Sequence, residues 1–145
     1  MTQKSLIART CAAMLMGAAA CGAPLAQAET IVGLTTTNAI VSFDSSAPGA
    51  ASALAFISGL QSANERILAI DLRPSNGMLY GISTDAKLYT LGSGGAASFV
   101  GSLGTALVGS ALGIDFNPEA DRQGLTSLRV VSSSGQNLAV NANTG

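Results

Sequence analysis

The sequence contains no histidine and no tryptophan, and only 10% of its 145 residues are charged. The absence of histidine excludes Ser-His-Asp and Cys-His catalysis, histidine-ligated zinc and a histidine general base. Seven basic against eight acidic side chains give no basic surface of the kind that binds nucleic acid. What the chain does have is 48% apolar residues and 17 glycines, a composition that argues against disorder.

The first 28 residues have the three parts of a secretory signal peptide. Lys4 and Arg9 form a basic start, and residues 11–20 form a short apolar run. Ala26-Gln27-Ala28 then provides the small-x-small pattern that signal peptidase recognises. The apolar run is shorter than the about 20 residues that a membrane-spanning helix needs. The sequence therefore predicts cleavage before Glu29 and export to the periplasm or the extracellular space.

The same segment contains an alternative processing site. Ala18-Ala19-Ala20-Cys21 resembles a lipobox, although leucine usually stands where Ala18 does. Lipidation of Cys21 would make the protein a lipoprotein held on a membrane surface. Cleavage after Ala28 instead removes both cysteines, so residues 29–145 could form no disulfide between them. The sequence favours the site at Ala28 and leaves lipidation as the alternative.

Residues 29–145 contain a repeat of four short apolar runs. The run Ile31–Thr36 recurs as Leu79–Thr84 and as Leu128–Ser133, at spacings of 48 and 49 residues. The other runs are Ala39–Asp44, Lys87–Leu91 and Asn137–Asn141; Phe56–Leu60 and Phe99–Leu103; and Leu68–Pro74 and Leu112–Pro118. They are short, partly β-branched or aromatic, and separated by glycine, proline, asparagine and serine, which predicts strands. A period of about 40–50 residues with four strands is typical of propeller blades.

The strand order predicts an all-β fold of about three partial propeller blades. The four strands of a blade can be named a to d, with a for the Ile-Asp run. The first unit then contains strands b, c and d, the second contains all four, and the third contains a, b and c. A closed propeller has about four to eight blades. The count therefore predicts residues 29–145 to be a fragment of a larger propeller, with open sheet edges that allow self-association. The Ala-rich stretch Pro48–Leu60 also has helix propensity, but its alignment with the glycine-rich Ser93–Leu103 favours a strand.

The second and third units carry a more specific pattern. It consists of Ile70–Pro74 and Leu79–Gly81, then Gly113–Pro118, Asp121-Arg122, Arg129–Ser132 and Gly135–Leu138. These residues resemble a family of exported bacterial proteins, the domain of unknown function number 4394, over about Ile31–Gly145. The resemblance implies a propeller-like fold and export, and it implies no activity. Gln123–Ser127 is an insertion relative to this family, which also continues beyond the point where this chain stops.

Asp71 and Asp115 hold the same place in successive repeats and are the best candidates for paired carboxylates. Together with Asn117 they would form the site of a metal-dependent enzyme, in which oxygen ligands bind a cation in a central channel. The competing interpretation is structural, because an Asp before a hydrophobic-x-Pro corner accepts backbone N–H groups of the turn. No Asp-x-Asp pattern supplies further ligands, so the structural interpretation is favoured and no metal or cofactor is expected.

Two further patterns have both a functional and a structural interpretation. Gly92–Ala97 fits the G-x-G-x-x-A form of a dinucleotide loop, but a β run follows where a helix is required, so a glycine hairpin is expected. Four polar side chains of the third unit suit an anion or a sugar: Arg122, Arg129, Gln136 and Asn137. The structural alternative pairs Arg122 with Glu119 or Asp121 on the surface and places Gln136 and Asn137 in a turn.

The residues favour binding over catalysis without indicating a ligand. Lys87 is the only lysine after residue 28, and with no histidine present no serine acquires an activating base. The leading hypothesis is an exported, non-catalytic module for binding or scaffolding. A metal-dependent enzyme with a channel site is the runner-up, and a truncated product without independent function is the third possibility.

Overall fold

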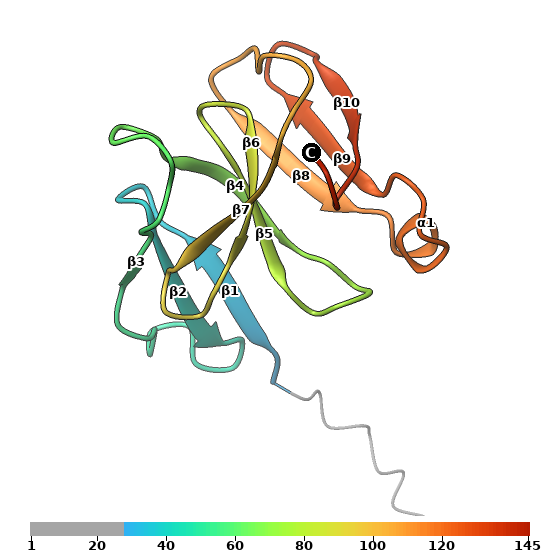
Figure 1. The fold of residues 1–145 in the computed structure, drawn as a ribbon. Coiled ribbons are helices and arrows are strands. Elements are labelled where there is room, and N and C mark those ends of the chain that lie inside the picture. The colour runs from blue at the N-terminus through green and yellow to red at the C-terminus, as the bar shows by residue number, and fades with distance from the viewer. Residues whose placement is uncertain (1–27) are drawn as a thin grey trace, which may run out of the picture.

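The computed structural model describes residues 28–145, so the predicted signal sequence as far as Gln27, with the lipobox, lies outside the described residues. The described part contains ten strands and one helix, arranged as three antiparallel sheets (Figure 1). The predicted all-β class is confirmed. No helix in this part of the chain has the length and apolar character needed to cross a membrane.

Each sheet is built from strands that follow one another in the chain. The first sheet contains β1 (Thr30–Leu34), β2 (Ala39–Asp44) and β3 (Ala55–Phe56). The second contains β4 (Ile67–Leu72), β5 (Leu79–Ser83), β6 (Lys87–Leu91) and β7 (Ala97–Ser102). The third contains β8 (Leu112–Phe116), β9 (Leu128–Ser132) and β10 (Asn137–Val140). The numbers of strands, three, four and three, are those expected from the repeat.

The turn between the second and third strands of the repeat has the same backbone shape in all three sheets. One residue in it has a positive φ: Asn38 at 61°, Ala86 at 54° and Gly135 at 83°. Asparagine and glycine adopt this left-handed conformation readily, whereas alanine does so at a cost of about 1–2 kcal/mol. The repeat therefore fixes a turn geometry as well as a pattern of strands.

Two predicted strands are wrong in their extent. Of the run Phe56–Leu60 only Phe56 belongs to a strand, the two-residue β3, because the backbone of Ser58 leaves the first sheet and bonds to Gly95 and Ala97 at the start of β7. The run Leu112–Pro118 ends as a strand at Phe116. Helix α1 (Pro118–Arg122) then begins, since Asn117 caps it by accepting the N–H groups of Glu119 and Ala120.

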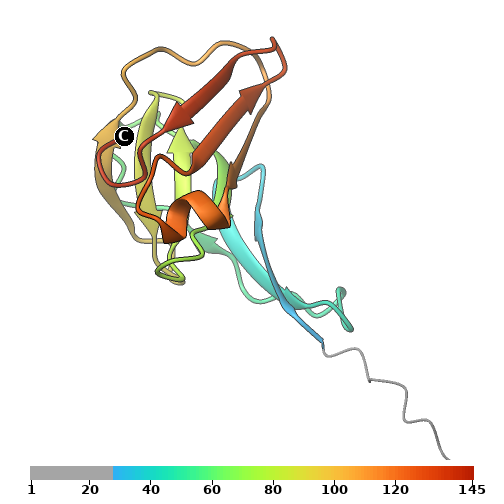
Figure 2. The same cartoon turned by 90° about the vertical axis from the view of Figure 1, so that its right-hand side faces the viewer.

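The four-stranded sheet lies between the other two (Figures 1 and 2). Two cores fill the spaces on its two sides. Between the second and third sheets the buried side chains are Tyr80, Ile82, Leu88, Leu103, Phe116, Leu128, Val130, Val140 and Ala142. Between the first and second sheets they are only Ile40, Ile67, Tyr89 and Leu91. The unequal cores leave a groove on the side of the first sheet.

Candidate functional site

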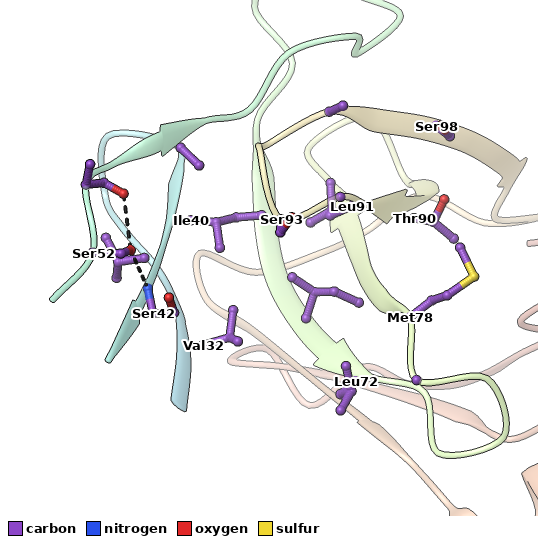
Figure 3. A pocket seen from close by; sticks show the side chains of 17 residues that line it. Val32, Ile40, Ser42, Ser52, Leu72, Met78, Thr90, Leu91, Ser93 and Ser98 are labelled. Atoms are coloured by element: carbon purple, nitrogen blue, oxygen red, sulfur yellow. Dashed lines mark hydrogen bonds between the residues drawn. The ribbon is translucent and has the colours of Figure 1, made fainter. Parts of the chain in front are cut away.

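The groove between the first and second sheets has a volume of about 780 Å³. Figure 3 shows Val32 and Ile40 on the side of the first sheet, facing Leu72 and Leu91 of the second. Met78, from the turn after β4, stands at the rim. The complete lining is Val32, Ile40, Val41, Ser42, Ser52, Ala53, Ala55, Leu72, Gly77, Met78, Leu79, Thr90, Leu91, Gly92, Ser93, Ala96 and Ser98.

The lining is apolar with a few hydroxyl groups and contains no charged side chain. Val32, Leu72 and Met78 are 41%, 53% and 46% exposed, which is high for large apolar side chains in or beside a sheet. The loop that carries Ser52 is held against β2, because Ser52 and Ser42 exchange hydrogen bonds of 2.8 and 3.0 Å. The groove therefore has walls fixed by backbone structure and an apolar floor open to solvent.

Small residues explain why the groove stays open. Ala53, Ala55 and Ala96 line it together with Gly92 and four serines, so no large side chain reaches across. Beside the groove the backbones of the two sheets approach closely: a Cβ built on Gly95 would lie 2.3 Å from the carbonyl oxygen of Phe56. The sheets are thus joined near Gly95 and separated along the groove.

The predicted carboxylate pair does not form a site. Asp71 Oδ2 accepts the backbone N–H of Phe116 at 2.7 Å, so it joins β4 to β8 and not to its own turn. Asp115 lies across the ladder from Arg129 and is exposed. Asn117 is used as the helix cap. No group of three His, Cys, Asp or Glu side chains suitable for a metal lies within residues 28–145.

A buried polar network joins the second and third sheets. Arg73 Nε donates to Asp121 Oδ1 at 2.7 Å, and Arg73 Nη1 donates to Asn143 Oδ1 at 2.7 Å and to the Tyr80 hydroxyl at 3.2 Å. The same guanidinium stacks within about 6 Å of the Tyr80 and Phe116 rings. The second and third units are therefore held together by a charge pair withdrawn from solvent.

The chemistry of this network is structural. Burial alone would raise the pKa of Asp121, but hydrogen bonds from Ser75, Arg73 and Ser127 lower the pKa to about 2. Its two oxygens accept the Ser75 N–H, the Ser127 hydroxyl and the Arg73 Nε–H. Three of the about four lone-pair sites of this carboxylate are therefore occupied, and its side chain is fully buried, so a substrate has no access to it.

A second buried carboxylate, Glu65, belongs to the loop before β4. Its oxygens accept hydrogen bonds from Ser83, from the Tyr89 hydroxyl at 2.9 Å and from Lys87 Nζ at 3.2 Å. Burial would raise the pKa of Glu65, but these hydrogen bonds outweigh it and hold the pKa below its ordinary value. Every buried side-chain polar atom in the described residues has a partner. Lys87 is thereby committed to Glu65 and to Asp85.

The glycine motif is a hairpin, as expected. Gly92–Ala97 connects β6 to β7, and Gly95 with φ of 85° closes the turn by donating to the carbonyl of Gly92. No helix follows it, so it has none of the geometry of a dinucleotide loop.

The four polar residues of the third unit are not brought together. Arg122 pairs with Glu119 on exposed α1 at 2.7 Å, as the structural alternative predicted, whereas Asp121 pairs with Arg73. Arg129 Nη1 donates to Asn137 across the strands. Gln136 instead holds the loop before β8, since its amide binds the carbonyl of Ala106 and the N–H of Val108.

Sequence reasoning missed both the groove and the Arg73–Asp121 pair. The pair had a weak signal, because Arg73 and Asp121 both belong to the pattern of the second and third units, in Ile70–Pro74 and Asp121-Arg122. The groove had only a weak one, namely the runs of alanine, serine and glycine after residue 45 and around residue 95.

Most of the chain matches a known protein family. Residues 39–145 match the family described as Domain of unknown function (DUF4394). The chain belongs to this family. The DUF4394 match covers β2 to β10 and ends at the last residue, which confirms the resemblance seen in the repeat units. No curated protein matches the chain.

Proposed function

We propose that this DUF4394 protein is an exported, non-catalytic β-propeller-type module that binds an apolar small molecule in the groove between its first two sheets. The observation that carries the proposal is the groove itself. Ligand pockets measure roughly 300–1,000 Å³ and combine apolar walls with a few polar groups. The volume of about 780 Å³, the apolar floor and the serine and threonine rim match that description.

The propeller part of the proposal is supported by the packing of successive sheets. Three units of the same strand order lie side by side, and the first strands of the second and third units, β4 and β8, are neighbours linked by Asp71. Adjacent blades of a propeller meet in this way, with their first strands nearest the axis. Export is supported by the signal pattern before Glu29. N-terminal sequencing of the exported protein tests cleavage at this site, and lipid on Cys21 would overturn cleavage before Glu29 and place the exported protein on a membrane surface.

The absence of catalysis is supported by where the titratable groups are used. Asp121 and Glu65 are enclosed in internal hydrogen bonds, and the lining of the groove contains hydroxyls but no acid or base. A hydroxyl without a neighbouring base is a weak nucleophile. The groove is therefore suited to hold a ligand and lacks groups that would transform it.

A matched pair of variants tests the ligand site. Met78→Glu places a charge at the rim of the groove, and Leu125→Glu places the same charge on a similarly exposed leucine outside it. We expect Met78→Glu to weaken binding of an apolar fluorescent dye at least tenfold, because a carboxylate must be desolvated against the ligand. Leu125→Glu should leave the affinity unchanged. Equal affinities for both variants would refute the groove as the site.

A further inference from the structure

The link between β4 and β8 is made by equivalent residues of two repeats. Asp71 in β4 accepts the N–H of Phe116, the residue that follows Asp115 in β8. The neighbouring pair of the antiparallel ladder, Asn117 and Ser127, is hydrogen-bonded, so the pair of Phe116 and Leu128 is not. The N–H of Phe116 therefore points away from β9 and is available to Asp71. The link therefore joins an aspartate in the first strand of one unit to the free edge of the first strand in the next unit.

Leu72 is the counterpart of Phe116 in the second sheet. It faces Leu79, and Arg73 N–H donates to the carbonyl of Met78, so the register is the same as in the third sheet. The N–H of Leu72 consequently points away from β5, at the open edge of β4, and Leu72 lines the same groove as Val32 of β1. Within the described residues it has no acceptor, because the first sheet begins with β1 and lacks a strand that would carry the aspartate.

The edge of β1 that does not pair with β2 is also free. Glu29 and Thr35 form backbone hydrogen bonds with residues on the β2 side, and hydrogen-bonded and free positions alternate along an antiparallel strand. The N–H and C=O groups of Thr30, Val32 and Leu34 therefore point to the free edge. From Thr30 to Phe43 the chain has no charged residue, whereas exposed edge strands usually carry charges that prevent pairing. Ile31 and Val32 are nevertheless more than 40% exposed.

We propose that the free edge of β1, together with the N–H of Leu72, binds an extended peptide strand that carries an aspartate between apolar residues. The strand pairs antiparallel with β1, as β4 pairs with β5 and β8 with β9. Its aspartate accepts the N–H of Leu72, as Asp71 accepts that of Phe116. Such strand addition takes affinity from main-chain hydrogen bonds and specificity from the side chain.

The occupant is a separate segment rather than the folded strands of a second copy. In β4 and β8 the pairing edge is already used by β5 and β9, so neither can pair with β1 of another molecule without leaving its own sheet. A free strand with the sequence character of β8 has both the edge and the aspartate available. The inference does not rest on the apolar ligand proposed for the groove, because it uses the edge of β1 and a backbone N–H.

A synthetic peptide with the sequence of residues 111–117, Ala-Leu-Gly-Ile-Asp-Phe-Asn, is the probe. Its binding to the purified protein is measured by fluorescence anisotropy of a label at its N-terminus. Val32→Pro removes an outward N–H of β1 without touching the bonds to β2. Ala139→Pro is the matched control, since Ala139 turns its N–H to the free edge of β10 in the same way.

We expect saturable binding of the peptide below about 1 mM. Val32→Pro should weaken it at least tenfold and Ala139→Pro should not change it. Replacing the peptide's aspartate by asparagine should weaken binding about fivefold, because a charge-assisted hydrogen bond is roughly twice as strong as a neutral one. No saturable binding, equal losses in the two proline variants, or equal affinity of the asparagine peptide would each overturn the inference.

Amide hydrogen exchange of the unaltered protein provides a readout that does not depend on the variants folding. Peptide binding should slow exchange at Val32 and Leu72, and should leave Ala139 unchanged. Absence of protection at both amides in the saturated complex overturns the inference. A protein that binds the peptide but no apolar dye would retain this strand site and lose the function proposed for the groove, so the two failures are distinguishable.

Discussion

The two sides of the middle sheet are packed differently. Toward the third sheet, nine buried side chains form a continuous core, Arg73 and Asp121 form a buried charge pair, and Asp71 ties the first strands together. Toward the first sheet, four buried side chains form the core and a groove of about 780 Å³ remains open.

The polar links on the open side are of a different kind. Asn38 Oδ1 accepts the N–H of Ile67 at 3.0 Å, Arg66 donates to the carbonyl of Thr36, and the backbone of Ser58 bonds to Gly95. All of them involve backbone groups and turns, and none corresponds to the link between first strands, because the part of the first unit that the structure describes begins with its second strand, β1. Where the repeat supplies a complete pair of first strands, the sheets close on each other; where it does not, they are held at turns and leave space.

The largest expected effect is loss of the buried charge pair. Arg73→Ala leaves Asp121 charged, buried and without its main partner, and should lower the free energy of unfolding by about 3–5 kcal/mol. Arg122→Ala removes an exposed pair with Glu119 and should cost less than about 1 kcal/mol. Urea unfolding followed by circular dichroism measures both. Similar losses in the two variants would show that the second and third sheets do not depend on Arg73.

The next effect compares the two cores directly. Leu128 is 1% exposed between the second and third sheets, so Leu128→Ala should lower the free energy of unfolding by about 2–5 kcal/mol. Leu72→Ala, in the groove, removes the same atoms from a side chain that is already more than half exposed. The loss there should be under about 1 kcal/mol. A loss at Leu72 as large as that at Leu128 would contradict an open groove.

The smallest effect is the acid dependence of the closed side. The pKa of Asp121 is about 2 in the folded protein and about 3.9 in an unfolded chain, so its contribution to stability is complete above about pH 5 and is lost as the pH falls to about 1. The contribution is about 2–3 kcal/mol. Asp121→Asn should reduce the slope of unfolding free energy against pH in this range, although its stability is lower throughout. An unchanged slope would mean that other carboxylates dominate acid unfolding.

The repeat predicted most of the fold, because short apolar runs separated by turn residues recur at a regular spacing in the sequence. It located the three sheets and their strand order, including the unequal ends. The limits of β3 and of the strand before α1 could not be obtained in this way. Ser58 pairs with a different sheet, and Asn117 starts a helix within a pattern that reads as a strand, so both depend on tertiary contacts or capping.

The candidate site was less predictable than the fold. Repetition singled out Asp71 and Asp115 as a carboxylate pair, but Asp71 links two units through a backbone N–H and Asp115 is exposed, so the two do not face one cavity. Arg73 and Asp121 are 48 residues apart and meet only when two sheets pack. The groove depends on side chains that are too small to fill it, and a composition rich in alanine and serine does not show where such space will lie.

The hydrogen bond from Phe116 to Asp71 also has a direction, which restricts the symmetry of any assembly built through it. One unit contributes the carboxylate and the next contributes the amide, so the two partners play different roles. A two-fold contact would also contain the reciprocal bond, from the N–H of Leu72 to Asp115, and the contact between β4 and β8 lacks it. Units joined by it must follow one another head to tail. Their array either closes into a ring or continues as a filament.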